Sequence, residues 1–221
     1  MSAPASSETP AEETGAGVLV VVAHPALEQS RVNRRLMRAA QALPGVEVRE
    51  LYRLYPDYLI DVAAEQAALA RARLVVWQHP LQWYAMPPLM KLWVDEVLAF
   101  GWAYGPGGTA LRGKDLWLAT STGGAQPSYR PDGYNRYLFD AFMPPYEQTA
   151  ALCGMRFLPP LLLHGAHKAD ERDLAAHAET YAQRLADYPA WPELELVEDC
   201  VACEVPPNAR PADRDLIKEA A

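Results

Sequence analysis

The sequence predicts a doubly wound α/β fold, a five-stranded parallel sheet in the order 2-1-3-4-5 with helices on both faces. Three observations support this prediction. Short apolar segments alternate with segments of helical periodicity, which is the pattern of βαβ units. Crossovers between parallel strands are right-handed, so the strands form one sheet with helices on each side. No sixth strand follows, which favours this order over the six-stranded dinucleotide-binding order.

The expected strands are short and apolar. The first is an unbroken run from Val18 to Ala23, which is typical of a strand buried on both faces and is too short for a buried helix. The second alternates apolar and polar side chains, and the third is again continuously apolar. The expected strands are 18–23, 46–51, 74–77, 116–120 and 157–163.

The expected helices have recognisable start and stop signals. Ser30 begins the first helix, and a Pro-Gly pair at 44–45 ends it. Asp61 caps the second helix, and two prolines at 87–88 open the third, since proline is tolerated in a first turn. A glycine-rich loop follows over 101–113. The expected helices are 30–43, 61–72, one that opens at 87 and includes Val97, 137–153, and 170–187.

Composition and charge restrict the class of protein. Half of the 221 residues are hydrophobic and 22% are charged, as in soluble globular proteins. No apolar run approaches the roughly 18 to 20 residues that cross a bilayer. The net charge of −8 comes from the ends, because residues 1–16 hold three acids and no base, and residues 192–221 hold eight acids and three bases. We therefore expect an acidic N-terminal tail (1–16), one domain (17–191) and an acidic C-terminal tail (192–221).

The charge distribution and the N-terminus also indicate where the protein acts. A balanced central region argues against nucleic-acid binding, which needs a concentrated basic face. One basic cluster has helical spacing and indicates a solvated helix face in preference to a phosphate-binding surface. Its members are Arg31, Arg34, Arg35 and Arg38. The N-terminus has no apolar segment typical of a signal peptide, so we expect a cytoplasmic protein without membrane insertion.

The three cysteines predict neither a disulfide framework nor a metal site. Cys200 and Cys203 have CxxC spacing, but no further pair of ligands lies at zinc-like spacing from them. We interpret them as incidental cysteines, with a redox-sensing disulfide as the alternative.

Three loops at one edge of the predicted sheet are the candidates for a ligand site, because ligands of doubly wound sheets lie beyond the carboxyl ends of the strands. The loop 24–33 has no dinucleotide or Walker motif, and Ser30 is either an ordinary cap or part of a monophosphate site. The loop 78–88 offers aromatic surface for a planar ring, or for packing. The glycines of 121–124 let a ligand approach the backbone. Together these loops would serve a ring, a polyol and a phosphate.

These segments resemble the NAD(P)H:quinone oxidoreductase family of flavodoxin-like flavoproteins, over residues 18–188. Within that family the chain is most similar to the ancillary subunits of glutathione-gated potassium efflux systems, to which 51–57 and 61–66 are also similar. The similar motifs are Ala-His-Pro at 23–25, Ser-x-x-Asn at 30–33, Gln-His-Pro-Leu-Gln-Trp-Tyr at 78–84, 87–95, 101–105 and Thr-Gly-Gly at 122–124.

The resemblance implies non-covalent FMN and a hydride transfer from NADH or NADPH through the flavin to a quinone, in two steps at one site. It implies three groups of cofactor-binding residues. Around the phosphate and ribityl chain lie His24, Ser30, Arg31, Val32 and Asn33. Along the isoalloxazine ring lie Leu81, Gln82, Trp83 and Tyr84. On its other side lie Ser121, Thr122, Gly123 and Gly124.

The resemblance also implies a homodimer. In the family, an aromatic from a segment like Trp102–Tyr104 reaches across a two-fold interface to the partner's flavin, so Trp102 and Tyr104 are expected to bind substrate. The family's larger quinone reductases also have a tyrosine five residues after the double glycine and a histidine six residues further on. Tyr129 matches the first, but Asn135 stands at the second. Tyr129 is thus a catalytic candidate, and a core or surface role is the alternative.

Two functions follow as expectations. The first is an FMN-dependent NAD(P)H:quinone oxidoreductase. The second is a flavin-loaded regulatory subunit that binds a membrane potassium/proton antiporter and lies on the inner face of the membrane through that partner. A third, an electron carrier like flavodoxin, is disfavoured because the aromatic residues near the site indicate a roofed pocket for a second planar molecule.

Overall fold

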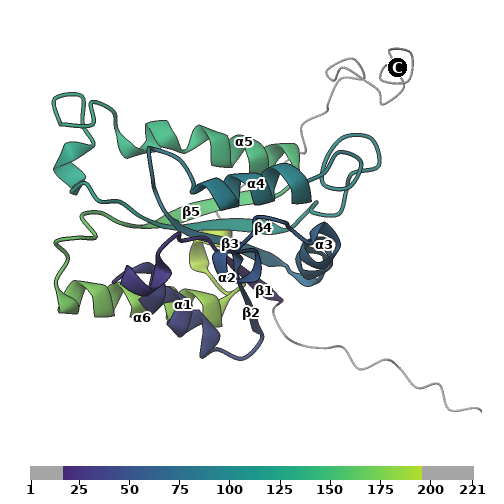
Figure 1. The fold of residues 1–221 in the computed structure, drawn as a ribbon, viewed down its shortest axis with the longest axis horizontal. Helices are drawn as coiled ribbons and strands as arrows, with labels where there is room; N and C mark the ends of the chain where they lie inside the picture. Colours follow the sequence, from purple (N-terminus) through teal and green to yellow (C-terminus); the bar gives the residue numbers. More distant parts are fainter. Residues whose placement is uncertain (1–16, 196–221) are drawn as a thin grey trace, which may run out of the picture.

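Five parallel strands form one sheet in the order β2-β1-β3-β4-β5 in the computed structural model, which describes residues 17–195 (Figure 1). This confirms the predicted fold class and strand order. The strands are β1 (Val18–Val22), β2 (Val46–Glu50), β3 (Leu74–Pro80), β4 (Asp115–Ser121) and β5 (Arg156–Leu163).

Helices cover both faces of this sheet. Figure 1 shows α1 and α6 together on one side and α4 and α5 on the other. The two hydrophobic cores agree with this arrangement, because one contains apolar residues of α1 and α6, and the other contains those of α2 to α5. The helices are α1 (Asn33–Gln41), α2 (Leu51–Leu54), α3 (Val62–Arg71), α4 (Pro88–Val97), α5 (Pro144–Leu152) and α6 (Glu171–Asp187). Among the residues that the structure describes, no helix is both long and apolar enough to cross a membrane.

The side chains of β1 point alternately into the two cores, which explains why its sequence is apolar throughout. Val20 and Val22 pack into the core under α1 and α6, whereas Leu19 and Val21 pack into the core under α2 to α5. All five residues of β1 are buried. Successive side chains of a strand point to opposite faces, so a central strand covered on both sides has no polar position.

Most predicted helix signals are confirmed. Asp61 accepts a hydrogen bond from the backbone N–H of Ala64 at 3.0 Å and so caps α3. Pro88 is the first residue of α4, as the double proline predicts. The short helix α2 was not predicted, because four residues are too few for a helical period to be recognised.

Three predicted boundaries were wrong. The helix expected from Ser30 begins at Asn33, and Ser30 Oγ accepts from the backbone N–H of Asn33 at 3.0 Å. The helix expected over 137–153 begins at Pro144, after a 3₁₀ turn at Phe139–Phe142. Strand β3 continues to Pro80, because its pairing with β4 extends to Ser121. Gln78 and His79 therefore lie buried in the sheet and not in the loop.

The ends of the chain were expected to be acidic tails. Residues 1–16 and 196–221, with Cys200 and Cys203, lie outside the described residues. The described part continues past the expected boundary at 191 into a 3₁₀ turn, Pro192–Glu195. The carbonyl of Leu194 in this turn accepts from Arg156 at 3.4 Å.

A buried carboxylate fastens α3 and α4 to the edge of the sheet. Glu65 is fully buried and forms an ion pair with Arg49 of β2 at 2.5 Å. Tyr55 OH donates to the same oxygen, Oε1, and Oε2 accepts from Trp93 Nε1 of α4 at 2.9 Å. A buried carboxylate needs such partners to offset its lost hydration.

His79 is a fully buried histidine of β3. Its ring stacks on that of Tyr146, with centroids 5.7 Å apart. Nδ1 lies 3.0 Å from the carbonyl oxygen of Pro80, so Nδ1 carries the proton in the neutral ring, because a carbonyl can only accept. Burial lowers the pKa of His79 to about 4.

We expect His79 to make the stability of the protein depend on pH. Unfolded His79 takes up a proton near pH 6.5, but the folded protein takes it up only near pH 4. The contribution to the free energy of unfolding is therefore complete above pH 6.5 and falls by about 3 kcal/mol as the pH drops to 4. Urea unfolding at pH 7.5 and 4.5 measures this dependence. His79→Gln should flatten it, and His167→Gln, at an exposed histidine, should not. If the free energy of unfolding changed equally between the two pH values in wild type and His79→Gln, the pH dependence would not come from His79.

Candidate functional site

A cavity of about 450 Å³ lies at the carboxyl ends of β1, β3 and β4. It is lined by residues from four segments: 24–33, 80–82, 121–123 and 166–167. The three loops that the sequence analysis placed together therefore do meet at one edge of the sheet. The predicted residues that line the cavity are His24, Ser30, Arg31, Val32, Asn33, Leu81, Gln82, Ser121, Thr122 and Gly123. The predicted residues outside this lining are Trp83, Tyr84, Gly124, Tyr129, Trp102 and Tyr104.

The first wall of the cavity is the segment between β1 and α1. Ser30 is used as a cap, since its hydroxyl oxygen accepts from Asn33. His24 Nδ1 accepts from the backbone N–H of Ala26 at 3.1 Å, which leaves the proton of the neutral ring on Nε2. Burial lowers the pKa of His24. His24 thus offers a neutral N–H donor at this wall.

Arg31 reaches the cavity from the same segment, but its charge is already paired. Its Nη2 lies 2.8 Å from Glu171 Oε1, and Arg35 Nη2 lies 2.6 Å from the other oxygen of Glu171. The hydrogen bonds from Arg31 and Arg35 hold the pKa of Glu171 below its usual value. Arg34 lies 3.5 Å from Glu28. Three members of the basic cluster, Arg31, Arg34 and Arg35, are therefore paired with carboxylates, and Arg31 also lines the cavity.

The second wall is a tight turn after β3. Gln82 and Ala85 exchange two backbone hydrogen bonds, of 2.9 and 3.0 Å. The residues between them, Trp83 and Tyr84, have φ angles of 48° and 64°. Two-residue turns of this hand normally contain Asn-Gly, because a side chain in the left-handed region costs about 1 kcal/mol or more. The turn leaves Trp83 93% exposed.

Tyr84 faces the segment that follows β4. Its ring stacks on Phe142 at 5.2 Å, and its hydroxyl donates to Asn135 Oδ1 at 3.3 Å. Asn135 also lies close to Gly124, where a Cβ would be 3.2 Å from Asn135 Nδ2. The turn after β3 and the segment after β4 are thus joined just outside the cavity lining.

The third wall is the end of β4. Thr122 Oγ1 donates to the carbonyl of Gly124 at 2.8 Å and lies 3.0 Å from His164 Nδ1. A Cβ on Gly123 would lie 3.2 Å from His167 Nε2, so only glycine fits there without displacing the imidazole. His167 also lines the cavity, although it was not among the predicted site residues. Its place shortly after β5, at the ligand edge of the sheet, is the signal that points to it.

Tyr129 is buried in the core beside this wall. Burial raises its pKa, and its ring lies 5.1 Å from that of His164. Asn135, at the position of the family's histidine, is bonded to Tyr84 instead. Tyr129 therefore has an imidazole neighbour, but it comes from the end of β5.

Trp102 and Tyr104 lie at the opposite edge of the sheet. They follow the carboxyl end of α4 and precede the first residue of β4, whereas the cavity lies beyond the last residue of β4. Helix α4 alone spans about 15 Å between these two edges. The structure therefore does not bring these residues to the cavity of their own chain.

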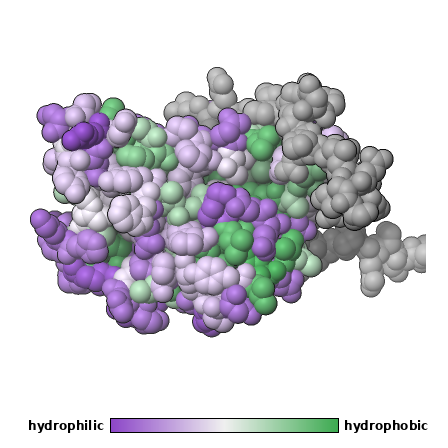
Figure 2. All heavy atoms as spheres, turned by 45° about the horizontal axis from the view of Figure 1, so that its top comes forward, coloured by the Kyte–Doolittle hydropathy of each residue, from purple (hydrophilic) through white to green (hydrophobic). Residues whose placement is uncertain are grey.

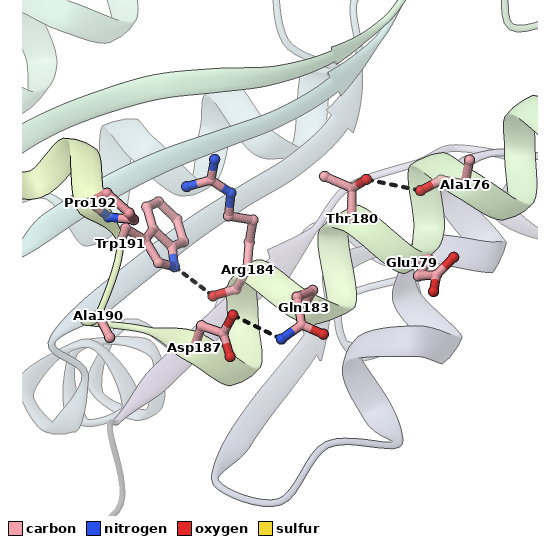
Figure 3. A pocket seen from close by; sticks show the side chains of 9 residues that line it. All are labelled: Ala176, Glu179, Thr180, Gln183, Arg184, Asp187, Ala190, Trp191 and Pro192. Atoms are coloured by element: carbon pink, nitrogen blue, oxygen red, sulfur yellow. Dashed lines mark hydrogen bonds between the residues drawn. The ribbon is translucent and has the colours of Figure 1, made fainter.

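A second hollow, of about 410 Å³, runs along α6 beside Trp191 (Figure 3). Gln183 Nε2 donates to Asp187 Oδ2 at 2.8 Å, and Trp191 Nε1 donates to the carbonyl of Arg184 at 2.7 Å. The Arg184 guanidinium lies 5.1 Å from the centre of the indole ring. None of the predicted site residues lines this hollow. Within residues 17–195, no group of His, Cys, Asp or Glu side chains is arranged to hold a metal ion.

The residues of the first cavity fit FMN chemically. Its volume is in the range of cofactor sites. Asn33 lines it, and Asn33 Oδ1 is buried with no partner in the described part of the chain, so a ligand hydroxyl can donate to it. His24 supplies a donor, and Gly123 permits close approach of a flat ring.

Comparisons with known proteins agree with this fold. A family model described as flavodoxin-like fold matches residues 16–185. The glutathione-regulated potassium-efflux system ancillary protein KefF of Citrobacter koseri is 52% identical over 176 residues, which are 80% of this chain and 97% of that protein.

Two solved structures are similar along most of their length. General stress protein 14 of Treponema denticola in complex with FMN is 38% identical, with a TM-score of 0.72, over 76% of this chain and 97% of that chain. An NADPH-quinone reductase from P. pentosaceus is 26% identical, with a TM-score of 0.68, over 76% of this chain and 96% of that chain. The chain therefore belongs to the flavodoxin-like fold family and, within it, to the group that contains the potassium-efflux ancillary protein KefF.

Proposed function

We propose that the chain is an FMN-dependent NAD(P)H:quinone oxidoreductase. The observation that carries the proposal is the cavity in which the loops after β1, β3 and β4 meet, with the donors, acceptor and glycine that FMN requires. The relatives support it, since a structure 38% identical to this chain contains FMN and one 26% identical is an NADPH-quinone reductase.

When bound, FMN supplies the two-electron chemistry, and the protein binds and orients it. The segment 24–33 would hold the phosphate and ribityl chain, with neutral His24 as a donor and the buried Oδ1 of Asn33 as an acceptor. Leu81 and Gln82 of the cavity lining would lie along the ring, and Gly123 would let its other side approach the backbone. The overall reaction converts NAD(P)H, a proton and a quinone into NAD(P)⁺ and a hydroquinone. One shared cavity requires NAD(P)⁺ to leave before the quinone enters.

A homodimer completes the site in this proposal. Trp102 and Tyr104 lie at the edge opposite the cavity of their own chain, so they can contact bound FMN or substrate only from a second copy. Trp83 is 93% exposed on a strained turn, as expected for a side chain that a second copy or a planar substrate covers. Isologous dimers are also the commonest oligomers.

We expect purified protein loaded with FMN to absorb near 450 nm, to lose this band with NADH or NADPH under anaerobic conditions, and to regain it with a benzoquinone. The absorption spectrum after each addition measures both half-reactions. A protein that takes up no FMN, or whose FMN neither nucleotide reduces, would contradict the proposed function.

The matched variants for this experiment are Gly123→Val and Ala125→Val. Valine at 123 would displace His167 and narrow the cavity, so FMN affinity should fall at least about tenfold. Ala125 is exposed and does not line the cavity, so Ala125→Val should bind FMN as the wild type does. Equal FMN binding by the two variants would place the cofactor elsewhere.

A separate experiment tests whether Tyr104 of one chain contributes to the cavity of the partner chain. Tyr104→Ala should bind FMN but reduce quinones slowly, and Gly123→Val should lack FMN. Co-expression of the two chains should restore activity, because a mixed dimer contains one site with intact FMN binding and an intact partner Tyr104. Restored activity of about half the wild-type value per mixed dimer is expected. Absence of any restoration would contradict the shared site.

A second candidate function is a regulatory subunit of a membrane potassium/proton antiporter, which would place the chain in the cytoplasm at the inner face of the membrane. The similarity to KefF, over 97% of that protein's length, favours it. Docking should not require catalysis, so a potassium/proton antiporter co-expressed from the same genome should co-purify equally with wild type and Tyr104→Ala. Failure of the wild type to capture it would contradict this candidate.

A further inference from the structure

Four buried polar residues form a line of hydrogen bonds beneath the cavity, which passes through both the backbone carbonyl and the side chain of Asn33. Tyr181 OH of α6 donates to Gln78 Oε1 of β3 at 3.1 Å. Gln78 Nε2 donates to the carbonyl oxygen of Asn33, the first residue of α1, at 2.8 Å. Asn33 Nδ2 donates to Ser121 Oγ, at the end of β4, at 3.1 Å. None of the four residues is more than 3% exposed.

We propose that Tyr181 and Gln78 are positioning residues of the cavity. They hold the start of α1 against β3 and β4 in the arrangement that binds the ribityl phosphate chain of FMN. Neither residue lines the cavity, so both act through Asn33. The inference rests on the proposed function, because the ligand that it concerns is FMN.

The carbonyl of Asn33 sets the orientation of the Gln78 amide, because a carbonyl can only accept and so faces the NH₂ group. The flipped amide would place Gln78 Oε1 against this carbonyl oxygen. Gln78 Oε1 therefore faces Tyr181, whose hydroxyl donates to it and holds the amide in place. Burial raises the pKa of Tyr181 far above its usual value, so the phenol keeps the proton that it donates. The ring of Tyr181 is itself held by stacking on Trp117, with centroids 5.5 Å apart.

The position of Asn33 in turn controls two walls of the cavity. Its backbone N–H is bonded to Ser30 Oγ, its carbonyl to Gln78 and its side chain to Ser121. Because the side-chain NH₂ is used by Ser121, the buried Oδ1 remains as the acceptor for a ligand hydroxyl. Loss of the Gln78 contact would free the first turn of α1 and misplace this acceptor.

The chain contains a matched control for the tyrosine. Tyr188 OH donates to Asp115 Oδ2 at 2.9 Å, and its ring lies in the same core as that of Tyr181. Asp115 is the first residue of β4, however, and so lies at the edge opposite the cavity. Tyr181→Phe and Tyr188→Phe each remove one buried hydroxyl from this core, but only the first touches the line of hydrogen bonds under the cavity.

The experiment is a fluorescence titration of flavin-free protein with FMN and with lumiflavin, which has the ring but no ribityl phosphate. Tyr181→Phe should weaken FMN binding about tenfold, the effect of one well-made hydrogen bond, and leave lumiflavin binding within about twofold. Tyr188→Phe should change neither affinity. Thermal unfolding of the flavin-free proteins should show similar losses of stability for both variants.

A second variant tests whether the two residues act together. Gln78→Met keeps the volume of the side chain but removes both of its hydrogen bonds, and it should weaken FMN binding at least as much as Tyr181→Phe. Adding Tyr181→Phe to Gln78→Met should then change FMN affinity by less than about twofold, because coupled residues are not additive.

The outcomes separate this inference from the proposed function. Unchanged FMN affinity in Tyr181→Phe, an equal loss for FMN and lumiflavin, or an equal loss in Tyr188→Phe would overturn the positioning role alone. A wild-type protein that binds neither flavin would overturn the proposed function, and the positioning role with it.

Discussion

The parallel pairing of β1, β3 and β4 is the constraint on which the site depends. Parallel strands end at the same edge of a sheet, and here the backbone hydrogen bonds continue past the strands into the loops. Ala23 N–H donates to the carbonyl of Gln78 at 2.9 Å, and Leu81 N–H donates to that of Ser121 at 2.8 Å. Thr122 N–H donates to Leu163 in the same way at 2.9 Å. The first residue of each cavity loop is therefore fixed by the sheet itself.

The polar residues of the central strands oppose the hydrophobic pattern that forms this sheet. A fully buried amide such as that of Gln78 is costly unless it is completely hydrogen-bonded, and both ends of this amide are. The left-handed turn at Trp83 and Tyr84 is a second local cost, again next to the cavity. Residues that oppose local conformational and hydrophobic preferences are common where a functional site must be held in one arrangement. The buried amide and the left-handed turn both lie at the edge of the sheet that carries the cavity.

Sequence patterns predicted the elements well where the signal is local. The unbroken apolar run of β1 and the cap at Asp61 depend on neighbouring residues alone. The predicted end of β3 was wrong because a glutamine such as Gln78 is typical of a loop unless its hydrogen-bond partners are known. One of these partners, Tyr181, is 103 positions away in the sequence. The place of His167 on the cavity wall also depends on a tertiary contact, with Gly123. The cofactor-binding segments came from a resemblance, and the structure adds that most of them line one cavity.

Helix α4 connects two functional ends of the chain. Its first turn follows the strained turn of Trp83 and Tyr84 beside the cavity, and its last turn leads to the segment of Trp102 and Tyr104 at the other edge. Trp93, in the middle of the helix, is fully buried and bonded to Glu65, whose carboxylate is paired with Arg49 of β2. The helix is thus held firmly on the sheet. In the proposed dimer, each copy of α4 would fix the distance between the cavity of its own chain and the aromatic side chains that this chain presents to the partner. The geometry of both sites would therefore depend on the buried ion pair between Glu65 and Arg49.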